Sequence, residues 1–308
     1  MSRIVSERSF EDAIECALLR NGPDAYEGDV RAAREPSPIY GEALLGGYHK
    51  RSPAEYDRAL CLLPRDLLDF VLATQPKEWD RLKQHHGSEV KERFLRRVSQ
   101  EIAARGALDV LRNGVKDSGV KFDLAYFRPS SGLNAELHRL HAANFFAVVR
   151  QLAYSEKNEK TLDMVLFLNG IPVFTVELKN PLTGQTVEDA IRQYKTDRDP
   201  REPLLAPGRC LAHFAVDPEL VYVTTRLAGP STVFLPFNQG KFGGAGNPPV
   251  PPTQAGYPTA YLWEQTWSRD SVLDLIRQFI HEVEIPNALG RKTRYRSLVF
   301  PASSASFN

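Results

Sequence analysis

Hydrophobic positions recur with a helical period in the first third of the chain. In residues 7–20 the apolar side chains fall on one stripe, which predicts an amphipathic helix. Residues 23–52 contain scattered Gly, Pro and Tyr without a sustained period, so a long loop is expected there. The helical pattern returns over residues 53–106, where Pro64 is expected to divide it. This part of the chain is therefore predicted to be mainly helical.

The pattern then changes to short apolar runs that are rich in β-branched and aromatic residues, which predicts strands. Asn169-Gly170 lies between two of these runs and is the strongest short signal for a hairpin in the chain. A helix is expected over residues 186–198. This order of elements is typical of a mixed α/β core, in which helices flank a central sheet. The predicted strands are residues 122–127, 145–154, 162–168, 171–178 and 220–225.

The last part of the chain is predicted to contain one more helix, over residues 268–284, followed by the basic run RKTRYR at 291–296. Before it, a Gly- and Pro-rich stretch cannot hold regular structure. The expected organisation is a core of residues 1–30 and 120–240, a mainly helical insertion at 40–118, a loop at 241–258, and a C-terminal helix with a basic linker at 259–308.

Charge and composition narrow the classes of function. Lys and Arg number 39 against 38 Asp and Glu, which gives a net charge of +1. No global charge therefore indicates a polyanionic partner, and any contact with nucleic acid has to rest on local charge. The three cysteines form no CxxC pair, which argues against a disulfide framework and a cysteine zinc site. Since no apolar run reaches the roughly 18 residues of a membrane span, we expect no membrane contact and a cytoplasmic location.

One apolar hairpin carries a cluster of charges at its open end. Asp163 begins one predicted strand, and Glu177-Leu178-Lys179 ends its partner. Alternation along a strand puts Glu177 and Lys179 on the same face. Carboxylate oxygens suit Mg²⁺, and a metal ion beside a lysine can polarise a phosphodiester and activate water. The alternative is that these residues are solvated charges at strand ends.

The register of the hairpin tests this interpretation. A two-residue Asn169-Gly170 turn with an unbroken ladder sets Asp163 opposite the residue before Glu177, so the two carboxylates point to opposite faces. One extra residue restores a shared face, for example a G1 bulge at Gly170, and Pro172 disturbs the ladder nearby. The sequence therefore predicts a bulge, and a clean two-residue hairpin would contradict the site.

Residues 144–200 resemble the N-terminal nuclease domain of the restriction (R) subunit of type I restriction–modification enzymes. The likeness lies in the motifs LDMVLFLNGIPVFTVELKNP and TVEDAIRQYKTDRDP. The core of that domain has the PD-(D/E)xK nuclease fold, with a mixed central sheet flanked by helices. The resemblance covers most of the chain, because further segments also look like parts of this subunit: residues 61–79, 210–229, 234–240 and 261–267.

The resemblance implies roles for particular residues. Asp163 and Glu177 would hold a divalent metal ion, Mg²⁺ with Mn²⁺ as a substitute, and Lys179 would assist the attacking water. An acidic residue on the first helix can join such a site, and Glu11 is the best match, with a solvated helix charge as its alternative. Leu162 stands where the motif often has proline.

The resemblance also implies contacts with DNA. The likeness of VVRQ favours Arg150, whose neighbour on the strand is expected to face the other way. Arg192 and Lys195 share a face of the helix at 186–198 and could contact phosphates, although an ion-paired surface helix is nearly as good an interpretation. Related nucleases carry Gln-x-x-x-Tyr on this helix. Here Gln193 keeps a role near the DNA, whereas the adjacent Tyr194 is out of place for the motif.

The resemblance implies a Mg²⁺-dependent endonuclease domain, a type I site-specific deoxyribonuclease, acting on double-stranded DNA with little sequence specificity of its own. Its partners would be methyltransferase (M) and specificity (S) subunits. ATP and S-adenosylmethionine would serve only the whole complex, since no phosphate-binding loop motif occurs in this chain. The chain is expected to stop before the helicase-like motor. The alternatives are a catalytically silent docking or DNA-binding module of the same complex, and a related PD-(D/E)xK repair or recombination nuclease.

Overall fold

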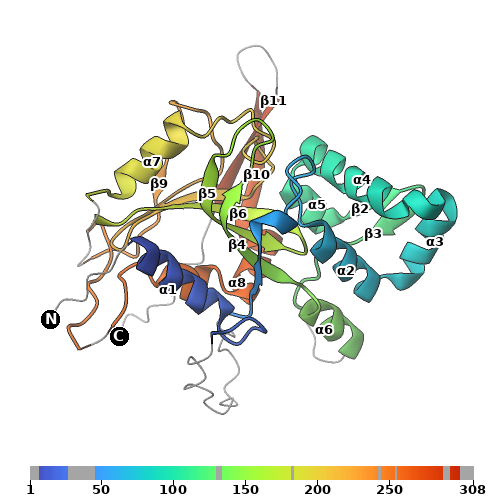
Figure 1. Ribbon diagram of the computed structural model, residues 1–308, viewed down its shortest axis with the longest axis horizontal. Coiled ribbons are helices and arrows are strands. Elements are labelled where there is room, and N and C mark those ends of the chain that lie inside the picture. Colours follow the sequence, from blue (N-terminus) through green and yellow to red (C-terminus); the bar gives the residue numbers. More distant parts are fainter. Residues whose placement is uncertain are drawn as a thin grey trace.

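A seven-stranded mixed sheet forms the centre of the protein in the computed structural model (Figure 1). Its order is β1-β4-β5-β6-β7-β8-β9, with β1/β4 and β6/β7 parallel and the other neighbours antiparallel. The strands are β1 (His49–Arg51), β4 (Phe146–Ala153), β5 (Thr161–Leu168), β6 (Ile171–Leu178), β7 (Ala212–Val216), β8 (Val221–Thr224) and β9 (Leu235–Pro236). The structure describes residues 7–26, 46–129, 134–181, 184–241, 244–253, 255–286 and 292–298.

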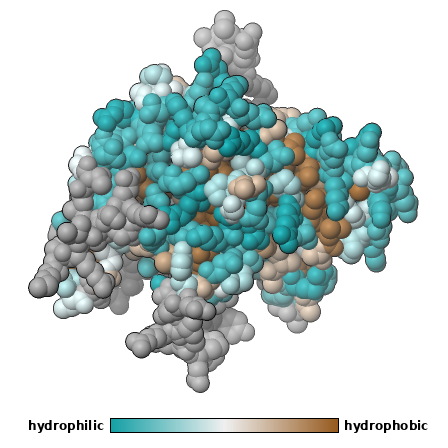
Figure 2. Space-filling model, in the orientation of Figure 1, coloured by the Kyte–Doolittle hydropathy of each residue, from teal (hydrophilic) through white to brown (hydrophobic). Residues whose placement is uncertain are grey.

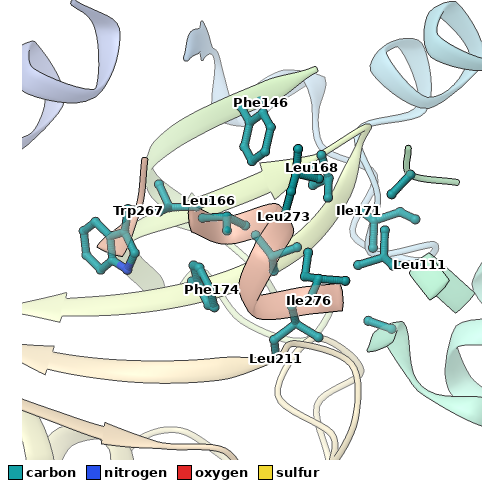
Figure 3. Packing of buried hydrophobic residues seen from close by; sticks show 14 of the residues in the cluster. Leu111, Phe146, Leu166, Leu168, Ile171, Phe174, Leu211, Trp267, Leu273 and Ile276 are labelled. Carbon is teal, nitrogen blue, oxygen red and sulfur yellow. The ribbon is translucent and has the colours of Figure 1, made fainter. Parts of the chain in front are cut away.

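Helices cover both faces of this sheet. On one face, α1 and the helical segments near the C-terminus share a large apolar cluster with the strands, and Figure 3 shows Leu273 and Ile276 beside Phe174. On the other face, Tyr194 of α7 packs into a second cluster. The expected mixed α/β architecture of a PD-(D/E)xK-like core is thereby confirmed. The covering elements are α1 (Glu7–Leu19), α7 (Val187–Thr196), η5 (Leu262–Thr266), α8 (Arg269–Asp274) and η6 (Leu275–Phe279).

A group of helices lies beside one end of the sheet (Figure 1). Pro64 and Pro76 are the first residues of two of them, where the missing N–H breaks no helical hydrogen bond. On the face shown in Figure 2, hydrophobic residues gather mainly toward this group. Across the described ranges, no helix is long and apolar enough to cross a membrane. The group contains α2 (Pro64–Thr74), α3 (Pro76–His86), α4 (Val90–Arg105), α5 (Ala107–Asn113), and the hairpin of β2 (Val115–Asp117) and β3 (Val120–Phe122), with α6 (Ala135–Ala142) following in the chain.

Two predicted segments near the N-terminal half are wrong in part. The loop expected over residues 23–52 contains β1, which pairs in parallel with β4 at the sheet edge. With only three residues, all of them polar, β1 is too short to show a hydrophobic period. The strand expected over residues 122–127 ends at Phe122, because Tyr126 makes its backbone hydrogen bonds to the side chain of Asn144 instead of to a strand.

The C-terminal helix predicted over residues 268–284 is also wrong in its last five residues, 280–284. Helical structure ends at Phe279, and residues Ile280–Pro286 form β10, which pairs with β11 (Lys292–Leu298). The sequence HEVEIP alternates polar and β-branched residues and ends in proline, which favours a strand. The basic run expected as a linker therefore lies mostly in β11, where the register pairs arginine positions with acidic positions of β10.

The β5–β6 hairpin combines a tight turn with a bulge. Asn169 and Gly170 have φ of 50° and 79°, and Leu168 pairs with Ile171, as in a two-residue type I′ turn. The ladder then shifts by one residue, so Val173 has no partner on β5. The predicted bulge is confirmed, but it lies three residues beyond Gly170.

Long-range contacts hold the turn and the bulge in place. The Val173 carbonyl accepts a hydrogen bond from the Leu211 backbone at 2.8 Å, just before β7. The Gly170 carbonyl accepts from the Leu63 backbone at 2.9 Å, and a Cβ on Gly170 would lie 2.5 Å from the Leu63 carbonyl oxygen. The closed end of the hairpin is therefore fixed against the start of α2, and its open end carries the predicted charges.

Candidate active site

Asp163 and Glu177 lie at the open end of the β5–β6 hairpin. The ladder is paired as far as Met164 and Val176, and its register continues to set Asp163 opposite Glu177. Asp163 Oδ2 accepts a hydrogen bond of 2.8 Å from the backbone N–H of Leu178, which fixes the carboxylate against the end of β6. The bulge thus places Asp163 and Glu177 on the same face of the hairpin, as the sequence interpretation required.

Glu177 is a buried carboxylate with unequal oxygens. Its Oε1 accepts a 2.6 Å hydrogen bond from Arg198 Nε, whereas Oε2 receives no hydrogen bond from the part of the chain that the structure describes. Burial raises the pKa of Glu177 to about 8, and the neighbouring Asp163 charge adds to this effect while Arg198 opposes it. The site therefore contains an oxygen that folding has removed from water without supplying a donor.

Lys179 completes the predicted trio. Its Nζ lies 3.9 Å from Asp163 Oδ2, and its side chain is 9% exposed. The backbone N–H of Lys179 bonds to the Val216 carbonyl of β7, so the lysine leaves the sheet at a fixed point. Asp163, Glu177 and Lys179 are therefore together, as expected for an Asp…Glu-x-Lys arrangement.

Glu11 reaches the same region through Gln151. The Gln151 amide nitrogen donates to Glu11 Oε1 at 3.2 Å and to Asp163 Oδ1 at 3.4 Å. Gln151 has a φ of 49° inside β4, a left-handed conformation that is uncommon for this residue type and is often found at functional sites. The Gln151 amide thus connects Glu11 of α1 with Asp163, and we call Asp163 and Glu177 the strand-end pair.

Arg150 is held by carboxylates of α1. Its guanidinium donates to Glu11 Oε2 and Asp12 Oδ1, both at 2.6 Å, and to Glu15 Oε2 at 3.2 Å. These partners outweigh the effect of burial and raise the pKa of Arg150. The sequence prediction that only one of Arg150 and Gln151 faces the site is wrong, because the left-handed backbone of Gln151 lets both contact Glu11. The guanidinium that the sequence predicts to contact DNA holds the Glu11 carboxylate in this structure.

The candidate DNA-contacting residues of α7 lie on its outer side. Arg192 is exposed and pairs with Asp189 one turn earlier, as in the ion-paired alternative. Gln193 and Lys195 are partly exposed. Tyr194 is fully buried, and its hydroxyl bonds to Thr175 Oγ1 at 2.8 Å. Tyr194 therefore supports the sheet next to the site and does not face solvent.

The donor set fits a hard divalent cation. Asp163 and Glu177 supply carboxylate oxygens at one place, and Glu177 Oε2 is buried without a donor within the described residues. Mg²⁺ is commonly held by one or two carboxylates together with waters and substrate phosphate. Among the described residues, no group of three or more His, Cys, Asp or Glu side chains could hold a metal ion by itself. The arrangement thus suits an open site that substrate completes.

Two residues of the site, Gln151 and Arg198, were not identified from the sequence as site residues. Gln151 depends on a positive φ that no local pattern predicts. Arg198 follows α7 and looks like one of several surface cations, but it is only 5% exposed and bonds to Glu177. Its position in the sequence was the one available signal. An arginine shortly after the helix that follows the Glu-x-Lys strand can fold back onto that strand.

Comparison with known proteins identifies a family for this chain. A family model described as the N terminus of the type I restriction enzyme R protein matches residues 71–232, more than half of the chain. The matched part includes Asp163, Glu177 and Lys179, whereas Glu11 precedes it. A search of curated proteins finds no match. The chain belongs to the family of type I restriction enzyme R protein N-terminal regions.

Proposed function

We propose that this chain is a Mg²⁺-dependent endonuclease domain that hydrolyses phosphodiester bonds of double-stranded DNA, as a type I site-specific deoxyribonuclease. One observation carries the proposal: Asp163, Glu177 and Lys179 meet at the open end of the hairpin, and one buried oxygen of Glu177 has no donor within the described ranges. Strongly perturbed carboxylates of this kind are concentrated in catalytic sites. Membership of the restriction-enzyme family supports the same assignment.

Each residue has a part in this proposal. Asp163 and Glu177 would hold Mg²⁺ or Mn²⁺, which supplies Lewis acidity toward a phosphoryl oxygen and lowers the pKa of bound water. Lys179 offers an ammonium group 3.9 Å from Asp163, where it orients the attacking water or stabilises negative charge on the phosphate. Gln151 and Arg150 hold Glu11 beside the pair, so that Glu11 can assist in binding the cation or its waters.

DNA would approach over α7. Arg192, Gln193 and Lys195 are proposed to contact the phosphate backbone, which gives position without sequence readout. We propose low sequence specificity, because phosphate contacts position DNA without reading its bases, and a net charge of +1 gives no strong basic footprint. We propose that recognition comes from S and M partner subunits, and that ATP and S-adenosylmethionine act in that complex and not on this chain.

Nicking of supercoiled plasmid in the presence of Mg²⁺ or Mn²⁺ tests the proposal. Wild type is expected to nick, and Lys179→Ala is expected to lose at least about a hundredfold in rate, the usual range for loss of a charge-stabilising group. Lys116→Ala, which removes an exposed lysine from the helical group, is the matched control and should nick like wild type. Nicking that survives Lys179→Ala contradicts the assignment.

The same assay distinguishes the alternatives. A wild-type protein that neither nicks DNA nor binds Mg²⁺ contradicts the proposal and favours the docking module. Cleavage that strongly prefers branched or ended DNA over plasmid favours a repair or recombination nuclease of the same fold. Both outcomes leave the observed fold unchanged.

A further inference from the structure

Three contacts hold the guanidinium of Arg198 next to Glu177. Its Nε donates to Glu177 Oε1 at 2.6 Å, and its second guanidinium nitrogen donates to the Thr161 carbonyl at 2.6 Å. The guanidinium carbon lies 5.6 Å from the centre of the Tyr154 ring, which is itself buried. The side chain of Arg198 is only 5% exposed, so its guanidinium is largely withdrawn from solvent. The guanidinium is therefore held in a fixed orientation toward Glu177.

This contact makes the two oxygens of Glu177 unequal. Oε1 already accepts from a cation, whose charge repels any dication that approaches the same atom. Oε2 is buried, accepts no hydrogen bond from the described part of the chain and does not carry the Arg198 contact, so it is the oxygen better placed to ligate a cation together with the neighbouring Asp163 carboxylate. A carboxylate restricted in this way can offer one oxygen to a metal ion but not two.

The number of oxygens matters for the choice of metal. Ca²⁺ takes 6–8 oxygen ligands, often with bidentate carboxylates, whereas the smaller Mg²⁺ requires near-octahedral geometry and keeps several waters. Single-oxygen ligation by Glu177 therefore disfavours Ca²⁺ more than Mg²⁺. The preference would come from a residue that does not itself touch the metal.

We infer that Arg198 is a positioning residue that restricts Glu177 to ligation through Oε2 and thereby selects Mg²⁺ over Ca²⁺ at the site. The inference rests on the proposed metal-dependent function, and it adds the residue that sets the selectivity of that site. Removal of Arg198 frees Oε1, so Glu177 can then ligate with both oxygens.

Isothermal titration calorimetry with MgCl₂ and CaCl₂, without DNA, tests this inference. The measured quantity is the ratio of the Ca²⁺ and Mg²⁺ dissociation constants. In Arg198→Met, which keeps a flexible, unbranched side chain without the charge or the hydrogen-bond donors, the ratio is expected to shift toward Ca²⁺ by about tenfold. Arg198→Lys keeps a cation next to Oε1 and should restore a ratio close to that of wild type.

The possible results are separable. If Arg198 had a purely structural role, Arg198→Met would weaken the binding of Mg²⁺ and of Ca²⁺ by the same factor. An unchanged ratio of dissociation constants in Arg198→Met therefore overturns the inference. If Arg198→Met does not fold, Arg198→Gln takes its place, since a neutral amide should still shift the ratio several-fold toward Ca²⁺, and an unchanged ratio again overturns the inference. If wild type binds neither cation, the proposed metal site itself fails, which is a different result from an unchanged ratio.

Discussion

Two groups of carboxylates lie next to each other in this protein, and their charges are balanced differently. On α1, three carboxylates surround Arg150, and the buried Glu15 also accepts hydrogen bonds from Lys50 and Tyr26. At the strand ends, Glu177 has one arginine for one oxygen and, within the described residues, no donor for the other. Both groups contain deeply buried acids.

We propose from this difference that the carboxylates at the strand ends have the chemical role, whereas the α1 cluster mainly stabilises the packing. A buried carboxylate with all its partners stabilises a particular packing, whereas one that lacks a partner is a cost to folding that function has to explain. Judged by composition alone, the acidic residues at helical spacing on α1 would be as good a candidate metal site as Asp163 and Glu177. Only the balance of donors and acceptors separates the two clusters, and the following predictions test that balance in order of decreasing effect.

The largest effect is expected from Arg150→Met, which removes the cation at the centre of the α1 cluster. The buried carboxylates left behind should lower the free energy of unfolding by about 3–5 kcal/mol. Urea unfolding of the two proteins measures the difference, and Arg150→Lys should lose less because it keeps the charge. A loss below about 1 kcal/mol would mean that this cluster does not depend on its arginine.

The next effect, comparable in total size but spread over several pH units, is expected from pH acting on Glu177. Because its pKa is raised to about 8 in the folded metal-free protein, the folded state holds a proton that the unfolded chain releases above a pH near 4.5. Stability from this group is therefore complete at low pH and falls as pH rises from about 5 to about 8, by up to about 1.4 kcal/mol per pH unit. Unfolding curves across this range should show the slope in wild type and not in Glu177→Gln. Identical slopes in both proteins would contradict the raised pKa.

The residue that links the two clusters provides a third test. Gln151 has a φ of 49°, a conformation that glycine adopts without strain and alanine does not. Gln151→Gly should therefore be more stable than Gln151→Ala by about 1 kcal/mol, the reverse of the usual order within a strand. Thermal unfolding of the pair gives the comparison, and a more stable alanine variant would argue against the left-handed backbone at the site.

The smallest effect is expected from Arg192→Ala on α7. Its ion pair with Asp189 is exposed, so the free energy of unfolding should change by less than about 1 kcal/mol. If Arg192 contacts a phosphate, the slope of log K against log salt for DNA binding should fall by about 1. Fluorescence anisotropy at several salt concentrations measures this slope. An unchanged slope would leave Arg192 as part of an ion-paired surface only.

The central hairpin was predictable because local and long-range signals agree there. The strands at 162–168 and 171–178 and the Asn169-Gly170 turn were predicted within a residue or two, since apolar β-branched runs and a type I′ turn act locally. A bulge was required to bring Asp163 and Glu177 together. Its place at Val173 was not predictable, because the Val173 carbonyl bonds to a residue that begins another strand.

The remaining errors have related physical causes. β7, Ala212–Val216, was missed because it is buried on both faces and its run shows no alternation. Residues 280–286 follow the preceding helix without a break, and their pairing with β11 stabilises the strand that their alternation favours. The role of Arg198 depends on a contact with a residue 21 positions earlier, which no local pattern contains.

The most direct test of the account is Mg²⁺ binding by calorimetry to wild type, Glu177→Gln and Glu15→Gln. The two variants make the same change to a deeply buried glutamate that accepts a hydrogen bond from an arginine, one in each cluster. The account predicts that Glu177→Gln loses at least about tenfold in Mg²⁺ affinity, while Glu15→Gln binds like wild type. Wild-type affinity in Glu177→Gln, or an equal loss in both variants, would contradict the claim that the strand-end pair is the metal site.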